Sequence, residues 1–374
     1  MKNQVGREIP DEILARMGKT GYRGLHDRDN ASYRKASPTV RALNDPQRGK
    51  LCASLREALE KCELHDGMYF GFHHHFRDGD YVINMVMQEV ARMGIRDITI
   101  CATSMGAAHD ALEPLIKQGV IAGIQSSGVR GKIGEAISKG KFKKPAIIRS
   151  HGGRVRAIEE GDIHLDVAFI GAPTADEYGN ARAVGGKSDC GVLSYSMADA
   201  KYADRVVVIT DCLVPFPNTP ASISMTDVDY VCVVDEIGDP KKIVSNVVRV
   251  TKDVRELMMA EYCTQIIAQS PYFKDGFSFQ TGGDGAALAV NGMLKPYMQQ
   301  KGIRMGFAIG GIMQAMCDLM DEGFVRKIVD AQVFDAAAIE HMKTNPNHVE
   351  ISTSEYANPM NKGAYVNKLD FVIL

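Results

Sequence analysis

Short apolar runs alternate along this chain with segments whose apolar residues have helical spacing, and this alternation constrains the fold most. Helical patterns such as residues 81–93 and 105–117 separate several of the runs. Strands that alternate with helices are typical of a mainly parallel sheet covered by helices, so we expect an α/β fold. The runs expected to form strands are 68–72, 98–101, 120–124, 146–148, 167–170, 206–209 and 230–234.

The pattern begins again in the last third of the chain, which predicts a second domain. Residues 250–269 form a helical pattern, and after Pro271 two strand-like runs each lead through paired glycines into a helical pattern. A length of 374 residues also favours about two domains. We therefore expect a polar N-terminal arm over 1–40, a first domain over 41–249 that opens with a helix over 45–62, and a second domain over 250–374.

Charge and cysteine usage exclude several classes of protein. The net charge is −2, from 44 basic and 46 acidic residues, so the chain has no electrostatic footprint for nucleic acid or an anionic bilayer. No signal-peptide core and no window of about 18 apolar residues occurs, which argues against a membrane span. The eight cysteines form no CxxC pair, as expected of reduced thiols in a cytoplasmic protein.

Two of the predicted strands end in loops suited to ligand binding. The run 146–148 leads into Arg149, Ser150, His151, Gly152, Gly153 and Arg154, where cations accompany a bare backbone that an anion can approach. The second run, 165–170, leads into a polar loop that ends at Asn180. Ligands of open parallel sheets lie beyond the carboxyl ends of the strands, so both loops are expected to face one crevice.

Three consecutive histidines follow the first predicted strand. Extended geometry would place His73 and His75 on one face and His74 on the other. A metal site, a structural histidine loop and hydrogen-bond donation to a carboxylate or thioester oxygen are all compatible with the residues. No HExxH or CxxC motif accompanies them, so no metal is expected here.

Further glycine-rich turns allow both a structural and a functional interpretation. Arg130 and Lys132 lie among glycines spaced as in a phosphate loop, but Ile133 stands where that motif needs Ser or Thr. They either open a helix as solvated cations or contact a pyrophosphate or an acidic carrier surface. The pairs Gly282 and Gly283, and Gly310 and Gly311, are each expected to precede a helix, where backbone N–H groups could hold an oxyanion. Glu355, Tyr356 and Asn358 are candidates for substrate contact.

Several of these motifs together resemble one known family. RSHGGR at 149–154, GAPTADEYGN at 171–180, IGDP at 237–240, DGMYFGFHHHFRDGD at 66–80 and YANP at 356–359 are similar to the alpha subunit of citrate lyase. The resemblance implies two similar, mainly parallel-sheet α/β domains of the CoA-transferase (NagB/RpiA-like) type with an active site between them. It also implies that alpha subunits continue beyond residue 374, so the second domain is expected to be incomplete.

The same resemblance implies an activity. It is the exchange of the acetyl group on an acyl carrier protein thioester for citrate, giving citryl carrier protein and acetate. The implied partners are the beta (lyase) and gamma (acyl carrier protein) subunits, and the CoA-like prosthetic group belongs to the carrier, so this subunit needs no cofactor of its own. A non-catalytic ligand-binding or assembly module on the same fold is the alternative.

These inferences together assign the site residues. The candidate catalytic residues are His73, His74, Gly282 and Gly283. The candidate substrate- or arm-binding residues are Arg130, Lys132, Arg149, His151, Gly152, Gly153, Arg154, Asn180, Gly310, Gly311, Glu355, Tyr356 and Asn358.

Overall fold

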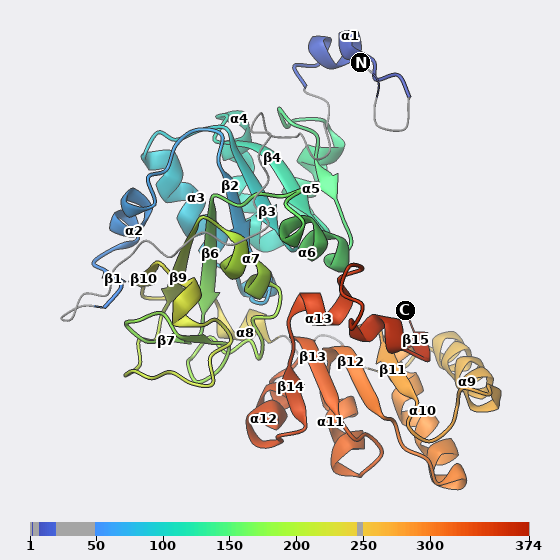
Figure 1. Ribbon diagram of the computed structural model, residues 1–374. Helices are drawn as coiled ribbons and strands as arrows, with labels where there is room; N and C mark the ends of the chain where they lie inside the picture. Colours follow the sequence, from blue (N-terminus) through green and yellow to red (C-terminus); the bar gives the residue numbers. More distant parts are fainter. Residues whose placement is uncertain (1, 3–6, 20–48, 245–249, 374) are drawn as a thin grey trace. The chain divides into compact units, whose positions relative to one another are not determined.

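The computed structural model describes residues 2, 7–19, 49–244 and 250–373 (Figure 1). These residues form two compact units, each with its own parallel sheet. The first unit comprises residues 1–188 and 195–243, and the second comprises 189–194 and 244–374. The short segment 189–194 thus groups with the second unit although it lies within the first in sequence. Most of the expected N-terminal arm lies outside the described residues.

Eight parallel strands form the sheet of the first unit. Their order is β1-β10-β9-β6-β2-β3-β4-β5, with β2 near the middle. The strands are β1 (Leu51–Cys52), β2 (Tyr69–Phe72), β3 (Ile98–Ala102), β4 (Ile121–Ser126), β5 (Ile147–Ile148), β6 (Val167–Ala172), β9 (Arg205–Thr210) and β10 (Tyr230–Val233). The seven strands expected between residues 68 and 234 are therefore present and parallel, and most of their side chains are buried.

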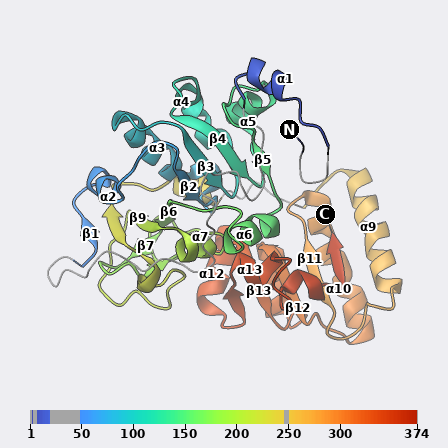
Figure 2. The same ribbon diagram turned by 45° about the horizontal axis from the view of Figure 1, so that its top comes forward.

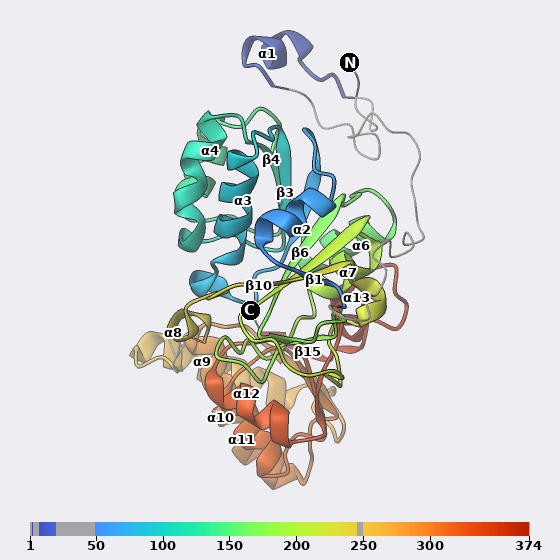
Figure 3. The same cartoon turned by 90° about the vertical axis from the view of Figure 1, so that its left-hand side faces the viewer.

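Helices cover both faces of this sheet (Figure 3). On one face lie α2 (Leu55–Lys61), α3 (Val82–Arg92) and α4 (Glu113–Lys117), and on the other lie α6 (His151–Glu159) and α7 (Ser196–Tyr202). The remaining elements are α1 (Asp11–Arg16), α5 (Gly131–Ser138), α8 (Pro240–Ile243), the antiparallel pair β7 (Thr174–Ala175) and β8 (Ala181–Arg182), and the 3-10 turns η2 (Arg77–Gly79), η3 (Ala107–Leu112) and η4 (Met225–Asp227).

One predicted helix is shorter than expected. The spacing of Leu51, Leu55 and Leu59 predicts one helix over 45–62, but Leu51 and Cys52 form β1, which pairs with β10, and α2 begins only at Leu55. Residues 45–48 lie outside the described residues. The Ser54 hydroxyl caps α2 by accepting a hydrogen bond from the Glu57 N–H, so the helix start is set by a cap that the leucine spacing does not reveal.

The second unit is a five-stranded parallel sheet in the order β14-β13-β12-β11-β15. One face carries α10 (Gly285–Lys301), α11 (Gln314–Asp321) and α12 (Ala336–Thr344), and α9 (Val254–Gln269) lies along α10 (Figure 2). Side chains from α13 (Thr353–Ala357) and η5 (Tyr365–Lys368) pack on a buried core of Ile309, Val329 and Ile351. The strands are β11 (Ser278–Thr281), β12 (Phe307–Ile312), β13 (Ile328–Val333), β14 (His348–Glu350) and β15 (Phe371–Ile373).

The apolar run 368–374 has the composition of a strand in a sheet interior, but β15 is an outer strand among the described residues. β15 pairs with β11, and the Val372 side chain is 48% exposed. Asp370 ties its start to the sheet, because its carboxylate accepts hydrogen bonds from the N–H and hydroxyl of Ser278 at 2.9 Å each.

No helix among the described residues is long and apolar enough to cross a membrane. All eight cysteines are free thiols.

Candidate functional site

The carboxyl ends of β2, β3 and β5 bring polar side chains together in the first unit. His73 and His74 follow β2, Thr103 follows β3, and His151 begins α6 shortly after β5. The three strands run parallel within one sheet, so their carboxyl ends lie at one edge, where open α/β sheets bind ligands.

The three histidines follow β2 and have different surroundings. His73 and His75 are buried, and their Nδ1 atoms lie 3.0 Å apart. The His73 Nε2 lies 3.0 Å from the carbonyl oxygen of Gly171, which can only accept, so Nε2 carries the proton. His74 is half-buried and contacts different groups. The His75 ring also contacts the rings of His74 and Tyr195, with centroids 6.0 and 5.2 Å apart. The expected separation of His73 and His75 from His74 onto two faces is therefore not seen for His75.

Several rings gather around His74. His74 stacks on His151 with ring centroids 5.5 Å apart and planes 8° from parallel. Both rings contact Tyr195, each with centroids 4.9 Å apart. The Thr103 hydroxyl hydrogen-bonds the Nδ1 of His74. We call His74, His151, Tyr195 and Thr103 the ring cluster.

Burial keeps two histidines of this region uncharged. Desolvation lowers the pKa of His73 to about 4, and the same effect, assisted by the nearby Arg154 charge, lowers the pKa of His151 to about 4. Among the described residues, the buried Nδ1 of His151 has no hydrogen-bond partner. A neutral imidazole with an unsatisfied nitrogen can donate a hydrogen bond to a ligand oxygen but does not supply a positive charge.

These pKa values predict acid sensitivity of folding. The unfolded chain binds protons at His73 and His151 near pH 6.5, whereas the folded chain binds them only near pH 4, so lowering the pH between these values favours unfolding. We expect the free energy of unfolding to fall by up to about 3 kcal/mol per histidine over this window. Urea titrations between pH 7 and pH 4 measure this free energy, which should depend less steeply on pH in a His73→Gln variant. An equally steep dependence in that variant would contradict the low pKa of His73.

The predicted RSHGGR loop is largely helical. His151, Gly152, Gly153 and Arg154 form the first turn of α6, and the hydroxyl of Ser150 caps the helix by accepting the Gly153 N–H at 3.0 Å. The interpretation as an open loop is wrong, because the Ser150 cap starts the helix one residue later. Gly152 is buried, and the Gly153 N–H is already used by the cap.

The two arginines of that segment have different environments. Arg154 is 3% exposed and makes a bidentate ion pair with Asp199, at 2.8 and 2.7 Å, while its Nη2 also donates to the Cys101 carbonyl at 2.7 Å. The expected anion-binding role of Arg154 is therefore corrected to an internal one. Arg149 is half-buried and donates to Gln125 at 2.6 Å, on the carboxyl-end side of β4.

The other predicted binding residues of the first unit also include both exposed side chains and buried ones with internal partners. Arg130 and Lys132 have exposed side chains at the start of α5. Gly131 there has φ = +67°, and an added Cβ would lie 2.4 Å from the Asp110 carboxylate. Asn180 instead is buried, and its amide donates to Asp176 at 2.8 Å and accepts from the Met225 N–H at 3.1 Å. Asn180 holds its own loop together.

In the second unit only one glycine pair precedes a helix. Gly282 and Gly283 lead into α10, which Asp284 caps through the N–H groups of Ala286 and Ala287. The Gly282 N–H donates to the Ile373 carbonyl at 2.6 Å, so it is engaged by β15.

Gly310 and Gly311 were expected to precede a helix, but they lie inside β12, where the register with β13 shifts. Glycine is needed there for packing, because a Cβ on Gly311 would overlap the Phe334 ring. The prediction of a glycine turn is therefore wrong for this pair.

The third predicted group of the second unit lies on and beside α13. The Glu355 carboxylate completes a capping box by accepting from the Ser352 N–H at 2.8 Å. The Tyr356 hydroxyl accepts from Gln280 at 3.0 Å, and Asn358 is buried. Glu355 thus has a local structural role that explains its position.

Sequence reasoning missed Thr103 and Tyr195. Thr103 follows a strand without a recognisable motif, and Tyr195 directly precedes α7 without a motif of its own. Their places in the ring cluster depend on strand order and on the packing of α7, neither of which has a local signal.

Comparison with known proteins identifies the family. A family model described as citrate lyase, alpha subunit (CitF), matches residues 48–374. This chain belongs to that family. Its citrate lyase alpha chain relatives include those of Haemophilus influenzae, 47% identical over 87% of this chain, and Klebsiella pneumoniae, 46% identical over 90%. The chain spans 65% and 66% of the length of these two citrate lyase alpha chains.

Solved structures agree with this membership. A citrate lyase alpha subunit from Streptococcus mutans, determined in complex with citrate, matches with a TM-score of 0.89 and 49% identity, covering all of this chain and 72% of that one. The alpha subunit of a malonate decarboxylase from Acinetobacter baumannii matches with a TM-score of 0.58 at 15% identity, over 76% of this chain and 52% of that one. This second likeness shows a shared α/β fold.

Proposed function

We propose that this member of the citrate lyase alpha subunit family exchanges acyl groups on the thioester of an acyl carrier protein. A carboxylate oxygen of citrate attacks the acetyl thioester carbonyl, and collapse of the tetrahedral species expels the carrier thiolate and leaves a mixed anhydride. The thiolate then attacks the citryl carbonyl of the anhydride, so citryl carrier protein forms and acetate leaves. Atoms and charge balance without a redox partner or metal.

The single observation that supports this chemistry is the ring cluster at the carboxyl ends of β2, β3 and β5. Each addition step places negative charge on a carbonyl oxygen, which needs preorganised hydrogen-bond donors rather than an enzyme nucleophile. His151 is held neutral by burial and has an unsatisfied Nδ1, and its ring is fixed between His74 and Tyr195. The Thr103 hydroxyl can hold His74 in the tautomer that carries its proton on Nε2.

Three cationic residues of the first unit could bind negatively charged groups of the carrier protein and the substrate. The exposed side chains of Arg130 and Lys132 would meet a phosphate-bearing, CoA-like arm or an acidic carrier surface, and Arg149 would contact a carboxylate. In this proposal the arm belongs to the gamma subunit, a beta subunit completes the cytoplasmic complex, and this chain supplies no cofactor. The relative solved with citrate supports citrate as the carboxylate substrate.

Label release distinguishes exchange from a non-catalytic ligand-binding or assembly role. The purified chain is mixed with carrier protein bearing a labelled acetyl thioester, and citrate is added. We expect labelled acetate to appear together with citryl carrier protein, because the exchange transfers the thioester without net hydrolysis. A full-length relative serves as the positive control; carrier binding without citrate-dependent release by this chain would favour the non-catalytic role.

A further inference from the structure

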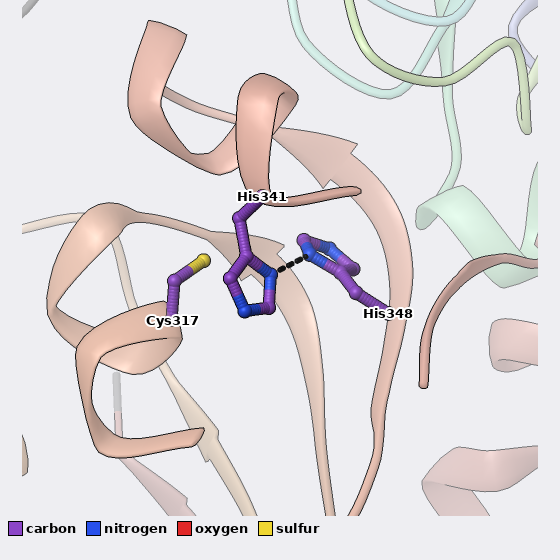
Figure 4. A group of neighbouring side chains, drawn as sticks. All are labelled: Cys317, His341 and His348. Carbon is purple, nitrogen blue, oxygen red and sulfur yellow. Dashed lines mark hydrogen bonds between the residues drawn. The ribbon is translucent and has the colours of Figure 1, made fainter. Parts of the chain in front are cut away.

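A cysteine and two histidines converge in the second unit, and none of them belongs to the site described above (Figure 4). Cys317 lies on α11, His341 on α12, and His348 at the start of β14. Each offers a ligand atom, and these atoms all lie within 4.8 Å of one another. Cys317 and His348 are each 3% exposed, so the group is an interior one.

We propose that Cys317, His341 and His348 bind a zinc-class divalent ion through Sγ, Nδ1 and Nδ1. Thiolate and imidazole are the ligands that Zn²⁺ and Co²⁺ prefer, and three protein ligands leave a fourth position for water. The two Nδ1 atoms lie 2.8 Å apart, against about 3.3 Å for two imidazoles at Zn–N distances of about 2.05 Å. The two Nδ1 atoms therefore need to move apart by only about 0.5 Å to admit the ion.

The hydrogen bonds around His348 leave its Nδ1 available as a metal ligand. Its Nε2 lies 3.1 Å from a carboxylate oxygen of Asp330, whose side chain is fully buried. The other oxygen of Asp330 accepts the Gln332 N–H at 2.8 Å, which fixes the carboxylate. A carboxylate accepts, so His348 carries its proton on Nε2 and directs the Nδ1 lone pair toward the group. Metal-ligating histidines usually have such a carboxylate behind them.

His341 also has a carboxylate near its Nε2, but its proton lies on the other nitrogen when no ion is bound. Its Nε2 lies 3.3 Å from the Asp321 carboxylate and 3.2 Å from the Asn345 amide. Without an ion, His341 donates its Nδ1 proton to His348 and accepts from Asn345. With an ion, His341 moves its proton to Nε2 and donates to Asp321, which frees Nδ1 as a ligand. Burial and, to a smaller extent, the charges of Asp330, Asp335, Asp318 and Asp321 raise the pKa of the Cys317 thiol in the absence of an ion. Binding of the ion requires this thiol to lose its proton to solvent, and the same negative charges favour a cation beside it.

A second cluster in the first unit lacks these features and provides a matched control. His164, Asp166 and Asp204 also come within reach of one ion. However, Asp166 accepts the Tyr69 N–H at 2.7 Å, and the His164 Nε2 lies 3.0 Å from Asp204. No thiol is present in that cluster.

Cobalt binding to the full chain, purified without a histidine tag, tests the proposal. We expect one equivalent of Co²⁺ to give a sulfur-to-metal charge-transfer band, which should disappear when Zn²⁺ displaces the cobalt. Zn²⁺ at a hundredfold excess over its Kd should raise the midpoint of thermal unfolding by about 5 °C. Cys317→Ser should abolish the band, and His348→Gln should weaken binding by at least about 100-fold. Asp321→Asn should weaken it about 10-fold. The controls Cys263→Ser and His164→Gln should leave both readouts unchanged.

Asp321 keeps the test valid if the buried variants do not fold. Its side chain is 65% exposed, so Asp321→Asn leaves the packing intact. An unchanged affinity in folded Cys317→Ser, a cobalt spectrum without a sulfur band, or an equal loss in His164→Gln would each overturn the site.

Discussion

Replacement of His151 by alanine is expected to slow citrate-dependent release of labelled acetate by about 100- to 1000-fold. Removing one oxyanion donor from a preorganised site has an effect of this size, and His151 is the ring-cluster residue with an unsatisfied, uncharged nitrogen. The rate constant at saturating citrate should fall much more than the KM changes, because the donor acts on charge that develops during the reaction.

Two further variants distinguish this role from packing. His151→Asn keeps an N–H donor near the Nδ1 position and should recover part of the rate, whereas His151→Phe keeps the ring contact with Tyr195 and should not. His164→Ala, a half-buried histidine outside the ring cluster, should retain the wild-type rate. Full activity in a folded His151→Phe chain would remove His151 from the reaction.

Arg154→Ala is expected to reduce the free energy of unfolding by about 3–5 kcal/mol. The substitution leaves Asp199 buried without its cation, and a buried ion pair that loses one partner is strongly destabilising. The matching substitution of both partners, Arg154→Met with Asp199→Leu, should restore much of the loss because no lone charge remains. Urea denaturation measures both variants.

Arg149→Ala is the matched control for Arg154→Ala. Arg149 is half-buried, comes from the same sequence motif and bonds to the neutral Gln125. We expect its unfolding free energy to change by about 1 kcal/mol, while citrate or carrier affinity falls about 10-fold or more. If Arg154→Ala proves the milder variant for stability, the buried pair with Asp199 does not have the structural role assigned to it.

The two arginines show how much of the site sequence reasoning could reach. The motif correctly indicated that polar residues after β5 lie at the carboxyl edge of the sheet. Local sequence does not record that Asp199, 45 residues further on, lies beside Arg154. A cation that binds a ligand and a cation that binds an internal carboxylate look identical until the partner is placed.

The histidines make the same point. Strand alternation predicts His73 and His75 on one face and His74 on the other. These residues lie beyond the end of β2, however, and the His75 ring contacts both His74 and Tyr195. The structure adds the neighbours, because Thr103, His151 and Tyr195 come from other elements. The pKa values of His73 and His151 likewise depend on burial, which no local pattern specifies.

For this protein, the sequence by itself determined the alternation of strands and helices, the parallel sheets and the family. Each of these follows from apolar periodicity or from contiguous motifs, and both are local properties. Only the tertiary structure decided which polar side chains already hydrogen-bond to partners within the protein, as Arg154, Asn180 and Glu355 do. It also brought Cys317, His341 and His348 together from three elements. Strand order and helix packing set these contacts, because they join residues that the sequence separates.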